Sequence, residues 1–402
     1  MKTGSRILIL PSGIEQVSVI RYAKELGLTV VALDKNPHAE GFPYADITVT
    51  ASPQEIDHCL QIAESHRIEA IVADQCDYSL FTSACIAKKL GLPGPSLKAA
   101  QFTTNKKLMR EQCQAMGITQ PPFRTCRTLE QAEQAVSEIG FPVILKPTDN
   151  RGCFGVTKVD DPSLLPEAFF EALVHAHSRE ILVEKFMRGT MVTVDGYFFR
   201  PEAYRVLGIA SKRKIEGRRC VDMEVMYPAE LSLELFQKLT DTNARVIQAL
   251  QLSYGPTHGE YMVTPEGGIY LIEIANRGGG VLTAPKILPA ISGANLPHLL
   301  IANSFGEFPL ADVPPPDSPL NACVLSFMDF GARGILKAVH GLSEALQLPG
   351  VLSIHLFAKP GKELPAITHG PSRHGFVIAQ SRTREGARQI VHQVLSTIRL
   401  ET

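Results

Sequence analysis

The sequence predicts an α/β fold that changes into an α+β fold part-way along the chain. In the first 95 residues, short apolar strands alternate with helical patterns, which indicates a parallel, doubly wound sheet. From residue 181 onward, strands follow one another with a single long helical pattern at 230–251, which favours antiparallel pairing. The predicted strands of the first part lie at 6–10, 29–33, 47–49 and 70–73, with a helix at about 54–67.

Proline and glycine mark the boundaries between the predicted domains. The run Leu92-Pro93-Gly94-Pro95 ends the first unit, and five prolines fall within 308–319. Between them we expect a helix at 104–116 and strands at 123–125, 142–146, 181–185, 191–199, 202–211, 259–263 and 268–274. After the prolines we expect strands at 320–330, 350–358 and 375–380 and a closing helix at 383–398. The predicted domains are 1–95, 96–308 with a small lid subdomain at about 120–185, a proline-rich linker at 309–319, and a small α+β domain at 320–402.

Composition narrows the class of protein. The 402 residues are 45% hydrophobic, enough for proper cores, and the net charge of −1 comes from interspersed charges, which does not favour nucleic acid or a charged membrane surface as partner. No apolar run is long enough for a membrane span or a signal peptide. The eight cysteines are scattered without a CxxC pair, which is typical of reduced thiols and predicts a cytoplasmic protein.

The segment VILKPTDNRGCFGV, residues 143–156, has the features of a phosphate-binding loop. An apolar strand ends in Lys146, whose ammonium group needs a counter-charge to offset its desolvation. Gly152 and Gly155 allow backbone N–H groups to approach the same phosphates closely. We interpret Cys153 as a small residue filling the loop rather than a thiolate nucleophile, because no histidine lies nearby in sequence.

Two carboxylates on neighbouring predicted strands indicate a metal–phosphate centre. Glu260 lies in His258-Gly259-Glu260, and Glu273 is followed by Asn276, Arg277 and three glycines. Carboxylates of this kind bind Mg²⁺ between phosphate oxygens, and an arginine stabilises charge on a transferring group. Together with the glycine loop, they predict an enzyme that uses ATP. His258 is a candidate for contact with phosphate or substrate, or for a structural role.

Other segments allow two interpretations. The turn PSGIEQ, residues 11–16, has one glycine where a dinucleotide-binding turn needs three, so Asp34 is interpreted as a turn residue and not a ribose ligand. Glu184-Lys185-Phe186 ends a predicted strand. Its backbone groups and carboxylate either bind the edge of an adenine ring or form a simple charge pair at the edge of the sheet.

Lys106 lies at the start of a predicted helix, and a lysine at such a position is in most proteins a solvated charge. The basic run at 212–219 is either a solvated face or the entrance for an acidic substrate.

In order and spacing, these segments resemble the ATP-grasp superfamily. The resemblance rests on Asn105-Lys106, ILKPTDNRGCFGV, VEKF, HGEYMV and IEIANRGGG. The first 95 residues look like the Rossmann-like domain that precedes the ATP-grasp fold in carbamoyl-phosphate synthetase, biotin carboxylase and the L-amino-acid ligases. The C-terminal segments at 349–351, 359–361 and 373–376 are most similar to the ligase branch.

The resemblance implies a role for each matching residue. The residues expected to contact ATP are Lys106, Lys146, Asn150, Gly152, Cys153, Gly155, Val156, Glu184, Lys185, Phe186 and Asp195. The residues expected to bind Mg²⁺, or Mn²⁺ in its place, are Glu260, Glu273 and Asn276. Arg277 is expected to be the catalytic residue, which stabilises the charge on the transferring phosphoryl group. Two positions depart from the family pattern. Met191 stands where a ribose-binding glutamate is usual, and Ala275 stands where a ligand asparagine is usual.

The resemblance implies an ATP-dependent ligase that joins a carboxylate, in the leading version an amino acid, to an amine through an acyl phosphate. Two alternatives stay open: a carboxylase or carbamoyl-phosphate-type enzyme that uses bicarbonate, and a nucleotide-binding protein that has lost catalysis. The partners expected are small-molecule substrates, neither nucleic acid nor membrane, and a second copy in a homodimer.

Overall fold

The N-terminal part of the computed structural model is a parallel sheet covered by helices. The structure describes every residue except 151, 153, 216–220, 310–320 and 332. The sheet has the strand order β3-β2-β1-β4 with all pairs parallel. Its strands are β1 Arg6–Ile9, β2 Thr29–Asp34, β3 Ile47–Thr50 and β4 Ala70–Val72, and its helices are α1 Val17–Glu25, α2 Ile56–Ser65 and α3 Asp77–Leu90. The predicted doubly wound sheet is confirmed, and Ile7, Leu8 and Ile9 are fully buried as such a sheet requires.

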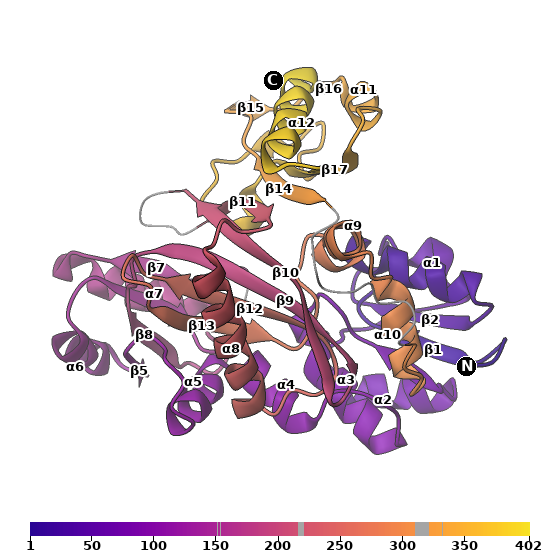
Figure 1. The fold of residues 1–402 in the computed structure, drawn as a ribbon, viewed down its shortest axis with the longest axis horizontal. Coiled ribbons are helices and arrows are strands. Elements are labelled where there is room, and N and C mark those ends of the chain that lie inside the picture. Colours follow the sequence, from indigo (N-terminus) through magenta and orange to yellow (C-terminus); the bar gives the residue numbers. More distant parts are fainter. Residues whose placement is uncertain (151, 153, 216–220, 310–320, 332) are drawn as a thin grey trace.

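A separate four-stranded antiparallel sheet lies at the opposite side of the molecule (Figure 1). Its order is β5-β8-β6-β7. Two helices, α6 and α7, pack their apolar residues against it. The bounds are β5 Phe123–Cys126, α6 Leu129–Ile139, β6 Val143–Pro147, β7 Thr157–Val159, α7 Leu165–Val174 and β8 Ile181–Lys185. Strand β7, which follows the glycine loop, is too short to have been predicted.

A large antiparallel sheet of eight strands forms the centre of the molecule. Its order is β13-β12-β9-β10-β11-β14-β19-β17. The strands are β9 Thr190–Arg200, β10 Ala203–Lys214, β11 Asp222–Tyr227, β12 Gly255–Val263, β13 Ile269–Ala275, β14 Ala322–Met328, β17 Val351–Leu356 and β19 Gly375–Ser381. Period-2 burial runs through β12, where alternate residues are buried and half-buried.

The C-terminal segment adds three strands to this central sheet and forms two small two-stranded sheets, β15-β18 and β16-β20. Strand β14 pairs with β11 in antiparallel register, Val225 opposite Leu325, and β19 and β17 follow. The expected small domain at 320–402 thus shares the central sheet with the preceding residues. Most of the predicted linker lies outside the described residues. Helix α12, Arg384–Thr397, packs on β14 and β19, and the remaining elements are α11 Leu342–Leu346, β15 Gly334–Ile335, β16 Ala338–His340, β18 Glu363–Leu364 and β20 Arg399–Glu401.

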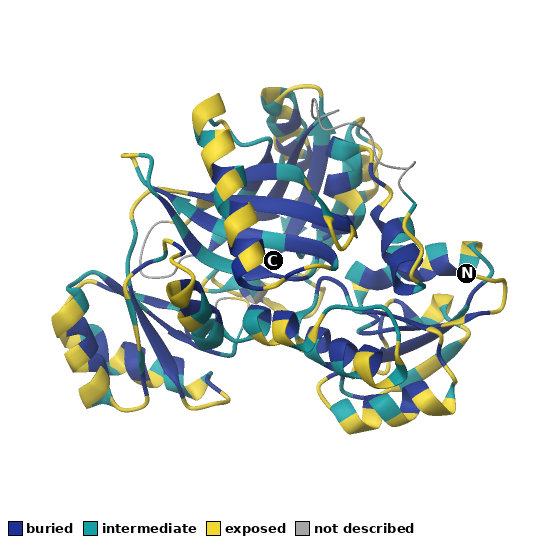
Figure 2. Cartoon of the chain, turned by 60° about the horizontal axis from the view of Figure 1, so that its bottom comes forward, coloured by how far each residue is buried: buried dark blue, intermediate teal, exposed yellow. Residues whose placement is uncertain are grey.

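Helices pack against both faces of the central sheet, and its strands β9 and β14 are almost completely buried (Figure 2). Helices α5 Lys106–Ala115 and α8 Leu233–Ala249 bury one face, and α9 Leu288–Ser292 packs against the other. Helix α10, Leu296–Ser304, inserts Ile301 into the core of the N-terminal sheet and joins the two parts. Helix α4 covers Leu97–Thr104. Within the described residues, no helix is long and apolar enough to cross a membrane.

Candidate active site

A cavity of about 360 Å³ lies where the four-stranded sheet, the central sheet, the start of α3 and a C-terminal turn meet. Its walls carry most of the predicted site residues together with several others. The lining residues used below are Asp77, Lys106, Lys146, Asn150, Gly152, Phe154, Val156, Met191, Lys212, Asp222, His258, Glu260, Glu273, Ala275, Arg277, Gly280, Val281, Thr283, Phe327 and Arg373. Charged groups of both signs therefore surround one space.

Lys146 reaches the cavity from the end of β6 and is held by a buried carboxylate. Its Nζ lies 2.6 Å from Oε2 of Glu184, and Nε of Arg110 lies 2.6 Å from Oε1 of the same side chain. Burial would raise the pKa of Glu184, but the two cations outweigh it and lower the pKa to about 2. Burial in turn lowers the pKa of Lys146. The Glu184 side chain thus fixes Lys146 and does not line the cavity itself.

Lys106 connects the glycine loop to the metal-binding candidates. Its Nζ lies 3.0 Å from Oε1 of Glu273 and donates to the carbonyl of Asn150 at 2.8 Å. The Asn150 amide donates to the carbonyl of His175 at 2.8 Å, which anchors the start of the loop. Gly152 and Gly155 have φ of +67° and +69°, a conformation that side chains disfavour. Cys153 lies outside the described residues.

The predicted adenine-reading edge is partly occupied by the protein itself. The backbone N–H of Lys185 donates to Pro122, and that of Phe186 donates to Pro142. The Lys185 ammonium donates to the carbonyls of Gly140 and Phe141. The two N–H groups are therefore not available to adenine.

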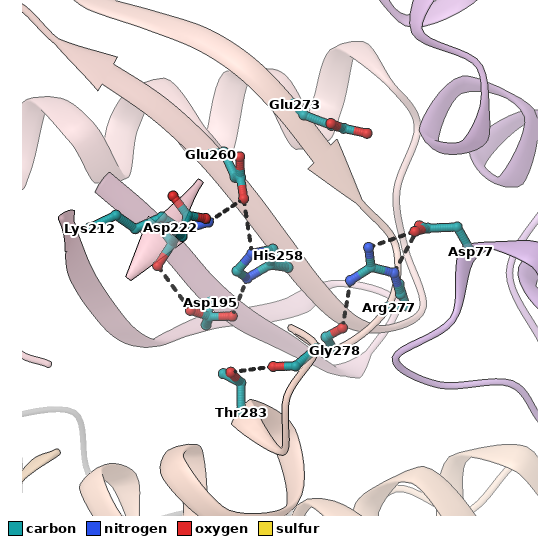
Figure 3. Close-up of polar contacts among 12 residues, drawn as sticks. Asp77, Asp195, Lys212, Asp222, His258, Glu260, Glu273, Arg277, Gly278 and Thr283 are labelled. Atoms are coloured by element: carbon teal, nitrogen blue, oxygen red, sulfur yellow. Dashed lines mark hydrogen bonds and ion pairs between the residues drawn. The ribbon is translucent and has the colours of Figure 1, made fainter. Parts of the chain in front are cut away.

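Glu260 and Glu273 face each other across neighbouring strands. They are paired residues of β12 and β13, next to a β-bulge that shifts the register between Glu260 and Tyr261. Oε1 of Glu260 lies 2.5 Å from Nζ of Lys212, and Lys212 contacts Asp222 at 3.0 Å (Figure 3). Burial would raise the pKa of Glu260, but Lys212 outweighs it and holds the pKa well below the ordinary value.

This pair of carboxylates fits Mg²⁺ bound together with phosphate. Mg²⁺ usually takes one or two carboxylates from the protein and its other ligands from substrate phosphates and water. Within the described residues, no cluster of three or more His, Cys, Asp and Glu side chains is suited to hold a metal ion. Glu260 and Glu273 are the residues that would hold the ion.

Asp195 does not line the cavity, which disagrees with the contact to ATP that the resemblance implies for it. It is fully buried and accepts a hydrogen bond from the Tyr227 hydroxyl at 2.6 Å. Its Oδ1 lies 2.7 Å from Nδ1 of His258 (Figure 3). Burial alone would lower the pKa of His258, but Asp195 outweighs it and raises the pKa to about 9. Asp195 therefore supports a protonated His258 beside Glu260.

Asn276 also lies away from the cavity, which corrects its prediction as a metal ligand. Its amide donates to the carbonyls of Tyr254 at 2.7 Å and Pro256 at 3.0 Å. Ala275 is the residue of this pair that lines the cavity. Successive strand residues point to opposite faces, so the one-residue offset of the asparagine turns it from the site into the protein.

Arg277 extends along the cavity wall and meets the N-terminal domain. Its Nε and Nη2 donate to the two carboxylate oxygens of Asp77 at 2.8 and 2.7 Å, and its Nη1 donates to the carbonyl of Gly278 at 2.9 Å (Figure 3). Burial would lower its pKa, but Asp77 outweighs it and raises the pKa. Across the cavity, the Arg373 guanidinium stacks 3.6 Å above the Phe327 ring.

Comparison with known families agrees with this geometry. The family model for the ATP-grasp domain matches residues 139–285, which include the glycine loop, Glu260, Glu273 and Arg277. The chain carries an ATP-grasp domain. A second model, for the L-amino acid ligase C-terminal domain 2, matches residues 327–402.

Relatives of this chain are similar to it over part of their length. It is 27% identical to an uncharacterized protein of Sinorhizobium fredii over 78% of this chain and 64% of that protein. It is 26% identical to the carbamoyl phosphate synthase large chain of Rubrobacter xylanophilus, over 64% of this chain and 26% of that protein. It is 28% identical to the D-alanine–D-alanine ligase of Geobacter sulfurreducens over 50% and 64%. The chain thus spans less than two thirds of each relative.

Solved structures share the whole fold. The L-amino acid ligase from Bacillus licheniformis superposes with a TM-score of 0.85 at 20% identity, covering 100% of this chain and 99% of that one. The phosphoribosylglycinamide synthetase from Anaerococcus prevotii gives 0.78 at 18% identity, covering 99% of both. At these identities the likeness shows the ATP-grasp architecture with its N-terminal and C-terminal parts.

The cavity and its surroundings contain residues that the sequence motifs did not single out. Arg110 follows Lys106 by four residues on α5, so the two lie on one helix face, and this spacing was a usable signal. Lys212 and Lys214 alternate along β10 and both line the cavity, so this part of the basic run faces the cavity. Asp77 and Arg373 had no signal, because each meets the site from another domain.

We expect Glu273→Gln to raise the Mg²⁺ concentration needed for half-maximal activity and to lower kcat by about 100-fold or more, because an amide is a poor substitute for a carboxylate on a hard cation. Asn276→Ala should leave the Mg²⁺ dependence unchanged and lower the free energy of unfolding by about 1–3 kcal/mol, since two buried carbonyls lose their donor. Magnesium titrations of phosphate release and urea unfolding measure both. If Asn276→Ala raised the required Mg²⁺ concentration as much as Glu273→Gln does, Asn276 would be a metal ligand after all.

Proposed function

We propose that the protein is an ATP-dependent ligase that joins a carboxylate to an amine, with an amino acid as the leading candidate for the acid. The observation that carries the proposal is the convergence of Lys106, Lys146, Glu260, Glu273 and Arg277 on one cavity of about 360 Å³. The names of relatives and structural neighbours, D-alanine–D-alanine ligase and L-amino acid ligase, support the same class of reaction. We expect it to act in the cytoplasm, where ATP is available.

The reaction has two steps in this proposal. A carboxylate oxygen attacks the γ-phosphorus of ATP, and ADP leaves, which gives an acyl phosphate. The amine then attacks the acyl carbon and loses a proton, and inorganic phosphate leaves. Such transfers depend on positioning and charge neutralisation more than on a protein nucleophile.

The residues of the cavity supply these needs. Lys106 and Lys146 neutralise phosphate charge, and the loop with Gly152 and Gly155 covers the phosphates. Mg²⁺ held by Glu260 and Glu273 would supply further positive charge between phosphate oxygens. Arg277 stabilises the charge on the transferred phosphoryl group. Met191 lines the cavity where the family has a ribose-binding glutamate, so ribose is bound without that carboxylate.

A screen for phosphate release tests the function. The purified protein with Mg²⁺ and ATP is incubated with single amino acids, with pairs of amino acids and with bicarbonate, and products are identified by mass spectrometry. We expect phosphate release that requires an acid and an amine together, with a condensed product and ADP in equal amounts, and none from Glu273→Gln. Release with bicarbonate alone would replace the ligase by a carboxylase, and ATP binding without any release would replace it by a nucleotide-binding protein.

Arg277→Lys should lower kcat by about 10- to 100-fold while the affinity for ATP changes by less than about twofold, because a guanidinium binds two phosphoryl oxygens in one plane and an ammonium cannot. Steady-state phosphate release and ATP affinity are measured on the same variant. Weakened ATP binding with unchanged kcat would assign Arg277 to the binding of ATP in the ground state.

A further inference from the structure

Three carboxylates of the N-terminal domain surround the segment 277–282, which follows β13 and lines the cavity. They are Glu15 from the turn after β1, Asp74 from the loop after β4, and Asp77 at the start of α3. We refer to these three residues as the acidic clamp. The domain that carries them lacks the glycine pattern of a dinucleotide site, and Asp34 at the end of β2 accepts hydrogen bonds from the N–H groups of Ser12 and Asn36 as a turn residue does.

Each member of the acidic clamp accepts a hydrogen bond from a different point of the segment. Asp77 accepts both Nε and Nη2 of Arg277, and Asp74 accepts the backbone N–H of Gly278 at 2.7 Å. Glu15 accepts the backbone N–H of Val281. Asp74 is buried, and Gln16 donates to its backbone carbonyl at 2.7 Å. The clamp therefore fixes the segment at three places, and its contact between Asp77 and Arg277 is the strong, charge-assisted one.

The segment needs such support because its backbone is strained. Val281 and Leu282 have φ of +57° and +60°, the left-handed region that a β-branched residue rarely adopts. Each such residue costs on the order of 1–3 kcal/mol and persists only where the surroundings determine it. Two hydrogen bonds hold the backbone in this conformation. The Glu15 carboxylate accepts one from the Val281 N–H, and the Thr283 hydroxyl donates the other to the Gly280 carbonyl at 2.8 Å.

Two glycines let the segment fit between the acidic clamp and the opposite wall. A Cβ on Gly278 would lie 2.9 Å from Oδ1 of Asp74 and 2.6 Å from the Cβ of Ala284. A Cβ on Gly279 would lie 2.9 Å from Nδ1 of His258. Neither contact is sterically acceptable, so the two glycines allow the chain to pass between Asp74 and His258.

The contacts also determine which donors stay available to a ligand. Three of the five N–H bonds of Arg277 go to Asp77 and the Gly278 carbonyl, and the N–H groups of Gly278 and Val281 go to the acidic clamp. Among the described residues, the remaining two N–H bonds of Arg277 and the N–H groups of Gly279 and Gly280 have no acceptor. Arg277 and Gly280 both line the cavity. An anion is the ligand that such donors bind.

We propose that the acidic clamp positions Arg277 and the glycine segment as a receptor for the phosphate formed in the reaction, so that the N-terminal domain completes the active site. The inference rests on the proposed ligase function for its substrate and on the contacts above for its geometry. Asp77, Asp74 and Glu15 act through the segment: they are positioning residues, and the groups that contact the phosphate belong to residues 277–280.

Asp77→Asn tests the acidic clamp at its strongest contact. An asparagine keeps the size of the side chain but presents an NH₂ group, a donor, to one of the two guanidinium donors. We expect kcat to fall at least tenfold with the KM for ATP within about twofold, and inorganic phosphate to bind the ADP–Mg²⁺ complex at least tenfold more weakly by calorimetry. Asp46→Asn is the matched control, because Asp46 pairs with exposed Lys24 in the same domain. It should retain wild-type values.

A double-mutant cycle separates positioning from a general loss of stability. In the Arg277→Ala background, Asp77→Asn should change phosphate binding by less than about twofold, because the residue through which it acts is gone. An equal loss in both backgrounds, or wild-type phosphate binding by Asp77→Asn, would overturn the proposal. Phosphate binding does not require turnover, so a protein that binds phosphate through the clamp but never releases ADP with any substrate would contradict the ligase function and not the clamp.

Discussion

Replacing Lys146 by alanine is expected to lower ATP-dependent phosphate release by about a thousandfold. A unit charge about 4 Å from a phosphate oxygen in a partly dry site contributes on the order of 4 kcal/mol, which corresponds to three powers of ten in rate. The fold should persist, because Glu184 keeps its second partner, Arg110, at 2.6 Å. Circular dichroism and steady-state phosphate release on the same preparation measure the two effects.

Lys107→Ala is the matched control for this variant. Lys107 is the neighbour of Lys106 on α5, and it pairs with Glu180 at 2.8 Å away from the cavity. Its loss should leave phosphate release within about twofold of the wild type, because such a pair stabilises the protein by about 1 kcal/mol at most. Wild-type turnover by folded Lys146→Ala would show that the loop at 143–156 does not bind the phosphates.

Arg110→Met is expected to lower the free energy of unfolding by about 3–5 kcal/mol, since removing one partner leaves a buried charge uncompensated. Arg110 is fully buried, contacts Glu184 and donates to the Ile272 carbonyl of β13 at 2.6 Å. Methionine retains much of the volume, so the loss measures charge and hydrogen bonding more than packing. Urea unfolding followed by circular dichroism gives the value.

The exposed pair Arg124–Glu138, at 2.8 Å, provides the control for Arg110. Arg124→Met should change stability by less than about 1 kcal/mol, because solvent already screens the pair. Adding Glu184→Gln to Arg110→Met should recover part of the loss, as the uncompensated carboxylate is then removed. A change below about 1 kcal/mol in Arg110→Met alone would mean that Lys146 suffices to balance Glu184.

Local patterns predicted the elements and the site residues whose roles depend on nearby sequence. The alternation of strands and helices gave the parallel sheet, and Lys146, Glu260 and Glu273 came from short motifs that all reach the cavity. Asn276 does not line the cavity, because it directly follows Ala275, the last residue of β13, and successive strand residues face opposite sides. Asp195 is occupied by Tyr227 and His258, and no local pattern encodes these contacts between strands.

The contacts that hold the site together join residues far apart in the chain. Arg277 and Asp77 are separated by 200 positions, and Gly278 and Asp74 by 204. Such pairs form only in the complete tertiary structure, and a single sequence carries no periodic signal for them. The residues that we propose to contact substrate were therefore predictable from local motifs, whereas the residues that position them were not.

The continuity of the central sheet has a consequence for anyone who shortens the chain. Strand β11 is paired on one side with β10 and on the other with β14, which belongs to the C-terminal segment. A fragment that ended at residue 309 would leave β11 as an open edge of the sheet. Val225 and Tyr227 would lose their partners on β14, Leu325 and Cys323. Unpaired edges of this kind recruit strands from other molecules. Truncation at the prolines would therefore yield an aggregating fragment, even though the linker looks in sequence like a natural place to cut.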